Sequence, residues 1–315
     1  MSDKTIELFV PAITPFTSAG EIDLARFVAH AKRLLAAGAH GLAPFGTTSE
    51  ANSLTLEERK SGLEALIEAG IAPGQLIPGT GCCSIGETVA LSAHATQLGC
   101  KGVLMLPPFY YKGVPEDGVF DAFSQVIDRV GSDLHVYLYH IPQMSGVPIT
   151  LGLIERLIER FGDQIAGLKD SSGDWSNTAA VIAAFPQIDT YSASESLIPE
   201  NAQAGGAGCI SASSNVNPRG IRDLIDGLGG ADEAALHAQV SSVRKIFEGV
   251  PLIPAIKAAV GALMTPALAT CARPSKPCRF STMPPLPRRS VLPVRSRCHE
   301  CAHRSGHRSR GVRML

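Results

Sequence analysis

The sequence predicts an α/β protein, a (β/α)₈ TIM barrel with a small C-terminal helical extension. Short apolar runs alternate with amphipathic helical stretches through the first part of the 315-residue chain, the pattern of parallel βα units. The first run leads into Thr14-Pro15-Phe16 and lacks the Gly-x-Gly-x-x-Gly turn of a doubly wound open sheet. Eight such units favour a closed barrel over that alternative.

The predicted strands are apolar runs bounded by polar or glycine-rich turns. Their lengths suit strands buried on both faces. We expect strands at residues 8–13, 40–45, 76–79, 103–106 and 135–139, in a run ending at Lys169, and at 188–191 and 207–211.

The predicted helices have start signals and one apolar face. The first runs from about Asp23 to Gly38, and capping boxes (Thr55 with Glu58, Ser84 with Glu87) begin the next two. Later helices are expected around 120–127, from Thr150, from about Asp174 and at 199–204, followed by purely helical stretches at 232–248 and 254–264. We therefore divide the chain into a barrel (1–228), a helical extension (229–264) and a tail (265–315).

The tail differs from the rest of the chain in composition. Residues 265–315 hold 11 of the 28 Lys and Arg and one of the 29 Asp and Glu, which leaves 17 basic and 28 acidic residues in 1–264. A basic, Pro-, Ser- and Cys-rich segment without periodicity is typical of disorder or of an out-of-frame C-terminus. Cys298, Cys301, His303 and His307 lack ordinary zinc-finger spacing, so a zinc site there is a minor alternative, as is a basic nucleic-acid-binding tail.

Composition also limits the classes of function. The acidic character of residues 1–264 argues against nucleic-acid binding. No apolar run is long enough for a membrane helix. The N-terminus lacks a signal-peptide pattern, so a cytoplasmic protein is expected. The cysteines of residues 1–264 lie in or beside apolar runs, and we expect them to be small buried side chains rather than a disulfide framework. They are Cys82, Cys83, Cys100 and Cys209.

Candidate catalytic side chains gather at the carboxyl ends of the predicted strands, where (β/α)₈ enzymes build their sites. Lys169 ends the sixth strand, Tyr139 ends the fifth, and Thr47 and Thr48 follow the second. A lysine buried at this point is suited to attack a ketone and form a Schiff base, with the tyrosine moving protons. Hydroxyl and N–H groups of the threonine turn suit a carboxylate.

The remaining expected binding residues lie at the same strand ends: Gly46, Ser194 and Ile210. Other interpretations stay open for the group. Lys169 could cap its strand and face solvent, Tyr139 could be a core tyrosine, and the threonines could be ordinary turn residues. Glu50 and Asp170 are expected to be structural partners of loop N–H groups. The predicted substrate is a small 2-oxo acid, with no cofactor and no metal.

Three motifs resemble, in order and spacing, the dihydrodipicolinate synthase/N-acetylneuraminate lyase family. They are Gly46-Thr47-Thr48-Ser49-Glu50, Tyr137-Leu138-Tyr139-His140-Ile141-Pro142 and Gly167-Leu168-Lys169-Asp170-Ser171. The resemblance implies a class I, Schiff-base, pyruvate-type lyase on a barrel with C-terminal helices. By position it implies that Lys169 forms the Schiff base, Tyr139 shuttles protons, Thr47 and Thr48 hold the keto-acid carboxylate, and Thr48 joins the proton relay.

The resemblance also implies a homo-oligomer, a dimer or tetramer, in which Tyr111 serves a neighbouring subunit's site, and a structural role for Lys257.

Two positions depart from the family pattern. Met144 stands where dihydrodipicolinate synthases carry an arginine for the incoming aldehyde's carboxylate, a contact that methionine cannot make. Ser49 stands where the turn usually has glycine.

We therefore expect aldol cleavage or dehydration of a 2-keto-3-deoxy sugar acid or a hydroxy-2-oxo acid. The alternative within the family is 4-hydroxy-tetrahydrodipicolinate synthase, which condenses pyruvate with aspartate semialdehyde. From other classes, the sequence allows a non-catalytic barrel that senses a 2-oxo acid, and less readily a metal-dependent aldolase, because His140 has no evident companion ligands.

Overall fold

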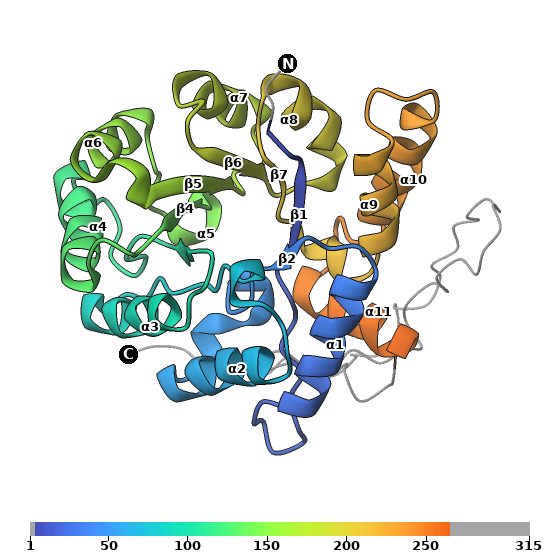
Figure 1. Ribbon diagram of the computed structural model, residues 1–315, viewed down its shortest axis with the longest axis horizontal. Helices are drawn as coiled ribbons and strands as arrows, with labels where there is room; N and C mark the ends of the chain where they lie inside the picture. The colour runs from blue at the N-terminus through green and yellow to red at the C-terminus, as the bar shows by residue number, and fades with distance from the viewer. Residues whose placement is uncertain (1–3, 265–315) are drawn as a thin grey trace, which may run out of the picture. The chain divides into compact units, whose positions relative to one another are not determined.

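A curled parallel sheet surrounded by helices forms the described part of the chain, residues 4–264 of a computed structural model (Figure 1). The sheet order is β2-β1-β7-β6-β5-β4-β3, with parallel pairing throughout. The strands are β1 Glu7–Val10, β2 Gly41–Leu42, β3 Val103–Met105, β4 Val136–His140, β5 Ile165–Asp170, β6 Asp189–Ser192 and β7 Gly208–Cys209.

The predicted strand at residues 76–79 closes the ring between β2 and β3, although it forms only isolated bridges. Leu76 pairs with Leu42, and Gly79 pairs with Leu104. The Ile77 N–H donates to the Leu42 carbonyl (2.9 Å), and the Leu104 N–H donates to the Pro78 carbonyl (2.9 Å). Pro78 has no N–H to extend the ladder, so the segment is extended and paired but too irregular for a regular strand. The predicted TIM-barrel fold is confirmed.

The helices follow the predicted order and add two that were not predicted, α5 and α9. Asn217 caps α9, since its side chain accepts from the Gly220 N–H (3.3 Å), and Pro218 occupies the first turn. Asn-Pro at a helix start was therefore a readable signal. The helices are α1 Leu24–Ala36, α2 Leu56–Glu68, α3 Ile85–Gln97, α4 Glu116–Val130, α5 Pro142–Ser145, α6 Leu151–Phe161, α7 Trp175–Ala184, α8 Ile198–Ala204, α9 Pro218–Asp226, α10 Glu233–Lys245 and α11 Leu252–Met264.

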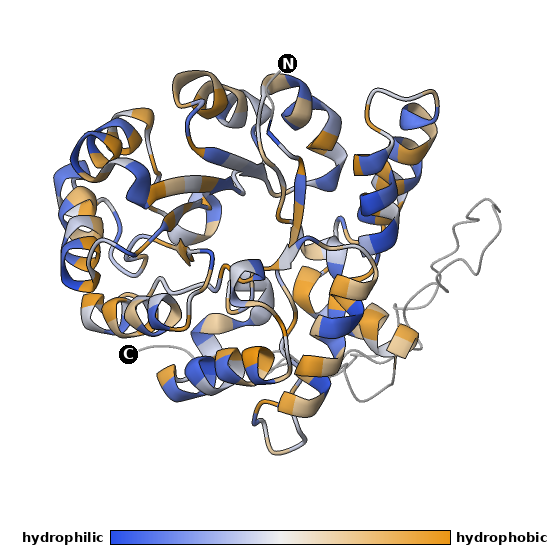
Figure 2. Cartoon of the chain, in the orientation of Figure 1, coloured by the Kyte–Doolittle hydropathy of each residue, from blue (hydrophilic) through white to orange (hydrophobic). Residues whose placement is uncertain are grey.

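Alternate side chains of each strand pack into two separate apolar layers. Leu8 and Val10 belong to the larger layer, which the helices cover, whereas Phe9 belongs to a smaller cluster with Tyr137, Tyr139 and other strand residues. This alternation follows from the two-residue period of a strand. In Figure 2 the helices are correspondingly banded with apolar and polar residues. The smaller cluster fills the barrel interior and supports the site above it.

Two helices, α10 and α11, follow the barrel within the stretch predicted as a helical extension. Helix α10 packs against α9 and the short 3-10 helix η5 (Glu195–Leu197), and α11 packs against the 3-10 helix η6 (Ala212–Asn215). Both contacted 3-10 segments follow barrel strands. No helix in residues 4–264 is long and apolar enough to cross a membrane. The predicted tail, including its candidate zinc residues Cys298, Cys301, His303 and His307, lies outside the described residues.

Candidate active site

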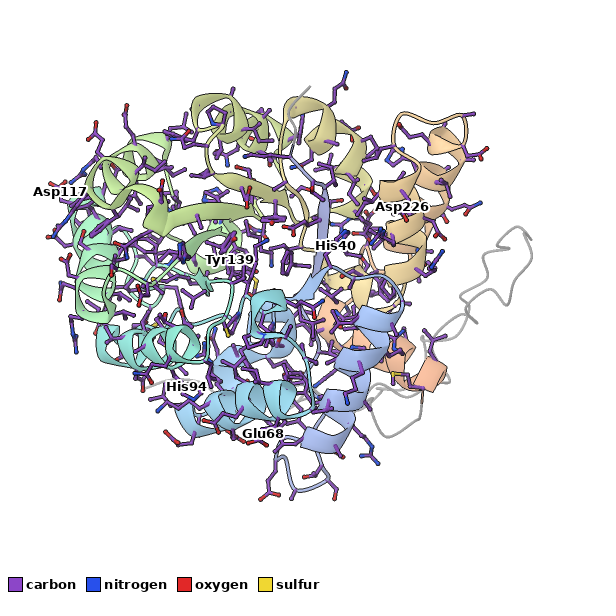
Figure 3. The ribbon with its side chains drawn as sticks, in the orientation of Figure 1. His40, Glu68, His94, Asp117, Tyr139 and Asp226 are labelled. Atoms are coloured by element: carbon purple, nitrogen blue, oxygen red, sulfur yellow. The ribbon has the colours of Figure 1, made fainter. Side chains whose placement is uncertain are left out.

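A cavity of about 300 Å³ opens beside the ends of β4 and β5. Five predicted residues line it: Lys169, Tyr139, Thr47, Thr48 and Ile210. Helix α5, the C-terminal helices and the turn between them complete the wall with Gln143, Met144, Arg244, Phe247, Glu248 and Leu252. In Figure 3 the labelled Tyr139 lies inside the ring of helices, whereas Asp117 and Glu68 lie at its periphery.

Lys169 and Tyr139 are neighbours across the β4–β5 pairing. Both are almost fully buried, at 4% and 3% exposure, and the Lys169 Nζ lies 4.2 Å from the centre of the Tyr139 ring. Lys169 therefore does not point into solvent. Gly167, on the same face of β5, leaves room below the lysine: a Cβ there would come within 2.5 Å of the Tyr137 ring, so glycine is required by this packing.

The Tyr139 phenol has a lowered pKa in spite of its burial. Burial alone raises the pKa of this phenol, but the Lys169 ammonium and hydrogen bonds with Thr47, Lys169 and Ser171 outweigh burial and lower the pKa below its usual value. The Thr47 Oγ1 lies 3.2 Å from the Tyr139 hydroxyl. A phenol of this kind suits proton transfer, since it holds and releases a proton nearer to neutral pH.

The Thr47-Thr48 turn is a 3-10 helix, η1 (Thr47–Ser49), flanked by unusual backbone. Phe45 and Glu50, on either side, are in the left-handed region with φ of 59° and 60°, a conformation that needs support from surrounding structure. Ser49 supplies part of it, because its hydroxyl donates to the Ala12 carbonyl (2.6 Å). The hydroxyl of Thr14 donates to the Ser49 carbonyl (2.8 Å). Ser49 and Thr14 thus join the turn to the segment after β1.

Helix α11 supports the same turn through a buried ion pair between Lys257 and Glu50. Lys257 is completely buried, and its ammonium also lies 4.3 Å from the centre of the Phe16 ring. Lys257 thus makes a structural contact, as expected. Glu50 was expected to accept from loop N–H groups, and the contact found here is with the Lys257 ammonium. Helix α11 therefore holds the Thr47-Thr48 turn in place.

Replacing Lys257 by methionine is expected to lower the free energy of unfolding by about 3–5 kcal/mol, because the buried Glu50 carboxylate loses its cation. Urea denaturation followed by circular dichroism measures the change. Lys60→Met is the matched control, since Lys60 pairs with Glu57 at the surface (3.3 Å) and should cost no more than about 1 kcal/mol. Equal losses in the two variants would contradict a special role for the Glu50–Lys257 pair.

Asp170 and His140, which adjoin Lys169 and Tyr139 in sequence, have structural partners. Asp170 accepts hydrogen bonds from the Ser172 N–H (2.8 Å), the Asn177 amide (2.9 Å) and the Thr178 hydroxyl (2.7 Å), which fixes the loop after β5 as expected. The His140 Nδ1 accepts from the Ile149 N–H (3.0 Å), and burial lowers the pKa of this histidine. No group of His, Cys, Asp or Glu within residues 4–264 could hold a metal ion.

Three predicted site residues do not line the cavity. Gly46 borders a smaller space beneath Tyr139. Ser194 caps η5, where its hydroxyl accepts from the Ser196 N–H (3.3 Å). Tyr111 is 77% exposed and stacks edge to face with Tyr110. Its predicted role in a neighbouring subunit's site stays a prediction.

Sequence reasoning missed the wall contributed by residues 244–252. Arg244 donates from Nη1 to the Glu195 carboxylate (3.0 Å) and to the Ser211 hydroxyl (3.2 Å). Glu195 is only 1% exposed and also accepts from the Ser211 and Ser213 hydroxyls. In the helical stretch predicted at 232–248, Arg244, Phe247 and Glu248 have the i, i+3, i+4 spacing of one face, whereas the observed helix α10 ends at Lys245 and leaves Phe247 and Glu248 in the following turn. That spacing was readable, but the sequence did not indicate that this face covers the barrel mouth.

Comparison with known proteins gives consistent matches. The profile of the Dihydrodipicolinate synthetase family matches residues 4–286. An uncharacterized DapA-like lyase of Chloroflexus aurantiacus is 39% identical over 250 residues, 79% of this chain and 83% of that protein. The crystal structure of dihydrodipicolinate synthase from Agrobacterium tumefaciens superposes with a TM-score of 0.79 at 30% identity, covering 88% of this chain and 95% of that chain. YagE from E. coli K12, in complex with pyruvate, superposes with a TM-score of 0.80 at 27% identity, covering 88% and 94%.

Proposed function

This chain belongs to the dihydrodipicolinate synthetase family, and from that premise we propose that it is a lyase that forms a Schiff base between Lys169 and a 2-oxo acid. The observation that carries the proposal is the position of the buried Lys169 Nζ, 4.2 Å from the centre of the Tyr139 ring, in a cavity that Thr47 and Thr48 also line. The YagE structure contains pyruvate, which supports a pyruvate-type substrate.

The proposed reaction uses the residues of the cavity in sequence. Lys169 gives a proton to Tyr139 and attacks C2 of the 2-oxo acid as the neutral amine. Transfer of a proton from the nitrogen to the former carbonyl oxygen gives the carbinolamine. Tyr139 then protonates this hydroxyl, which leaves as water, and the iminium forms while Tyr139 is left as the phenolate. Thr47 and Thr48 hold the carboxylate. The iminium then accepts the electron pair of the breaking C3–C4 bond, while Tyr139 removes the proton of the C4 hydroxyl. Protonation at C3 and hydrolysis of the imine release the shorter 2-oxo acid and free Lys169.

The proposed substrates are 2-keto-3-deoxy sugar acids or hydroxy-2-oxo acids, which undergo aldol cleavage or dehydration. Met144 supports them over aspartate semialdehyde. It lies at the cavity, 61% exposed, at the position that resembles the carboxylate-binding arginine of the synthases. A thioether has no N–H donors for a carboxylate. 4-Hydroxy-tetrahydrodipicolinate synthase activity is the second candidate, and the synthase of Rhizobium meliloti, 34% identical over 215 residues, favours it.

A homo-oligomer is part of the proposal. Tyr110 and Tyr111 form an exposed aromatic pair, and large exposed aromatic side chains are common at protein interfaces. A dimer or tetramer would let Tyr111 reach a neighbouring subunit's cavity.

Borohydride trapping tests the proposed chemistry. The full-length protein is incubated with saturating pyruvate, reduced with sodium borohydride and digested for peptide mass spectrometry. We expect a stable three-carbon adduct on the peptide that contains Lys169 and on no other lysine peptide. A sensor barrel that binds the 2-oxo acid without chemistry would give no adduct. Absence of the adduct at saturating pyruvate would exclude the proposal.

A further inference from the structure

We propose that Arg244, held in place by the buried Glu195, recognises hydroxyl oxygens in the part of the substrate beyond its three-carbon 2-oxo acid unit. This inference rests on the proposed Schiff-base function and names a specificity-determining residue for it. The cavity joins Lys169 on β5 to Arg244 on α10. A molecule attached to Lys169 and longer than pyruvate would extend toward the wall that Arg244, Phe247 and Glu248 form.

The geometry leaves Arg244 able to bind a further group. Its hydrogen bonds to Glu195 and Ser211, and a longer contact to the Ala193 carbonyl (3.5 Å), all use Nη1. Guanidinium carries five N–H donors, and within residues 4–264 neither Nε nor Nη2 of Arg244 donates to a protein acceptor. The side chain is 31% exposed. Arg244 is thus fixed at one nitrogen, and its remaining donors are available to a ligand in the cavity that it lines.

Glu195 is built to position this arginine. Its carboxylate is 1% exposed and is held by the hydroxyls of Ser211 and Ser213, so the arginine binds to an anchored anion. An anchored partner reduces the conformational freedom that Arg244 loses on binding a ligand. Glu195 itself is not among the cavity-lining residues, and therefore acts through Arg244.

The charges at this end of the cavity favour a neutral, hydroxylated group over a carboxylate. The charge of Arg244 is compensated by Glu195 at 3.0 Å, and the exposed carboxylate of Glu248 lines the same wall. A second carboxylate would meet two negative groups and only one guanidinium. Hydroxyls both donate and accept, so they can bond to Arg244 and Glu248 together. Met144 adds no cation that would change this balance.

A pair of aldehydes tests the assignment, because glyceraldehyde and propanal differ in their two hydroxyl groups. Condensation of each with pyruvate is measured for the wild type and Arg244→Met. We expect kcat/KM for glyceraldehyde to fall about 10- to 100-fold, as for the loss of charge-assisted hydrogen bonds, and that for propanal to change less than about threefold. Glu195→Gln should give a smaller loss of the same selectivity, and Arg244→Lys a partial recovery.

Two controls separate this proposal from the proposed function and from misfolding. Borohydride trapping of pyruvate on Lys169 should be unchanged in Arg244→Met; its absence in the wild type would overturn the function itself. Lys245→Met, an exposed neighbour on α10, should leave both aldehydes unaffected. Equal losses for glyceraldehyde and propanal in a folded Arg244→Met protein would overturn the role of Arg244. A greater loss for aspartate semialdehyde than for glyceraldehyde would overturn the assignment to neutral groups.

Discussion

Replacement of Lys169 by methionine is expected to lower turnover by at least about 10³-fold and to abolish the borohydride-trapped adduct, because no other described residue lining the cavity offers an amine. Methionine matches the length of the lysine stem, so the fold should be kept. Removal of a buried ammonium is expected to leave the free energy of unfolding unchanged or higher. The measurement is steady-state cleavage of a 2-keto-3-deoxy sugar acid, followed by coupled detection of pyruvate.

The control for Lys169 is Lys32→Met on the exposed side of α1. It should retain wild-type turnover and the adduct. If Lys169→Met retained more than about a tenth of wild-type turnover, catalysis by a Schiff base at this lysine would be contradicted.

Replacement of Tyr139 by phenylalanine is expected to lower kcat about 10²- to 10⁴-fold, the range for loss of a positioned proton donor and acceptor. The ring still fills the barrel interior, so the change removes only the hydroxyl 3.2 Å from the Thr47 Oγ1. Trapping of pyruvate on Lys169 should become slower but remain detectable. Tyr137→Phe is the matched control, because Tyr137 lies two residues earlier on β4 in the same interior cluster and does not line the cavity. It should change kcat less than about threefold.

The pH dependence follows from the same residue. Because the Lys169 ammonium and hydrogen bonds lower the pKa of Tyr139 despite burial, exchange of the pyruvate C3 protons should rise with pH through an apparent pKa below the usual value of about 10. In Lys169→Met, burial is opposed only by hydrogen bonds, so the Tyr139 pKa should move upward. Near-ultraviolet difference spectra against Tyr139→Phe measure this titration. A Tyr139 pKa that is the same in both backgrounds would contradict the electrostatic coupling.

The barrel and the half of the site that holds Lys169 were predictable from sequence, because their signals are local. Strand ends can be read from apolar runs, and side chains at the ends of parallel strands meet at one edge. Strand ends alone therefore predict that Lys169, Tyr139 and the Thr47-Thr48 turn lie together, and all four side chains line one cavity. The same signals predict a regular strand at residues 76–79, but this segment, which contains Pro78, is extended and forms only isolated bridges.

The other half of the site depends on long-range packing, which the sequence does not encode locally. Arg244 lies 49 positions after Glu195 in the chain, and nothing in either neighbourhood indicates their contact. Ser49 shows the same limit: its hydroxyl bonds to Ala12, 37 positions earlier, which explains how a serine serves in this turn. Ser194 looked like a binding residue because it follows a strand, yet its position just before η5 gives it a capping role.

The ion pair between Glu50 and Lys257 has a consequence for how such a protein can change during evolution. It links α11 to the Thr47-Thr48 turn, so loss of α11 would remove the cation that pairs with the Glu50 carboxylate. The segment after the barrel that contains α11 also supplies Arg244, Phe247 and Glu248, which are distant from Lys169 in sequence but line the same cavity. The identity of Lys257 is thus constrained by its ion pair with Glu50. The three wall residues can be substituted without breaking that ion pair. Under the proposed function, this stretch of chain could acquire new specificity while the chemical step at Lys169 stays the same.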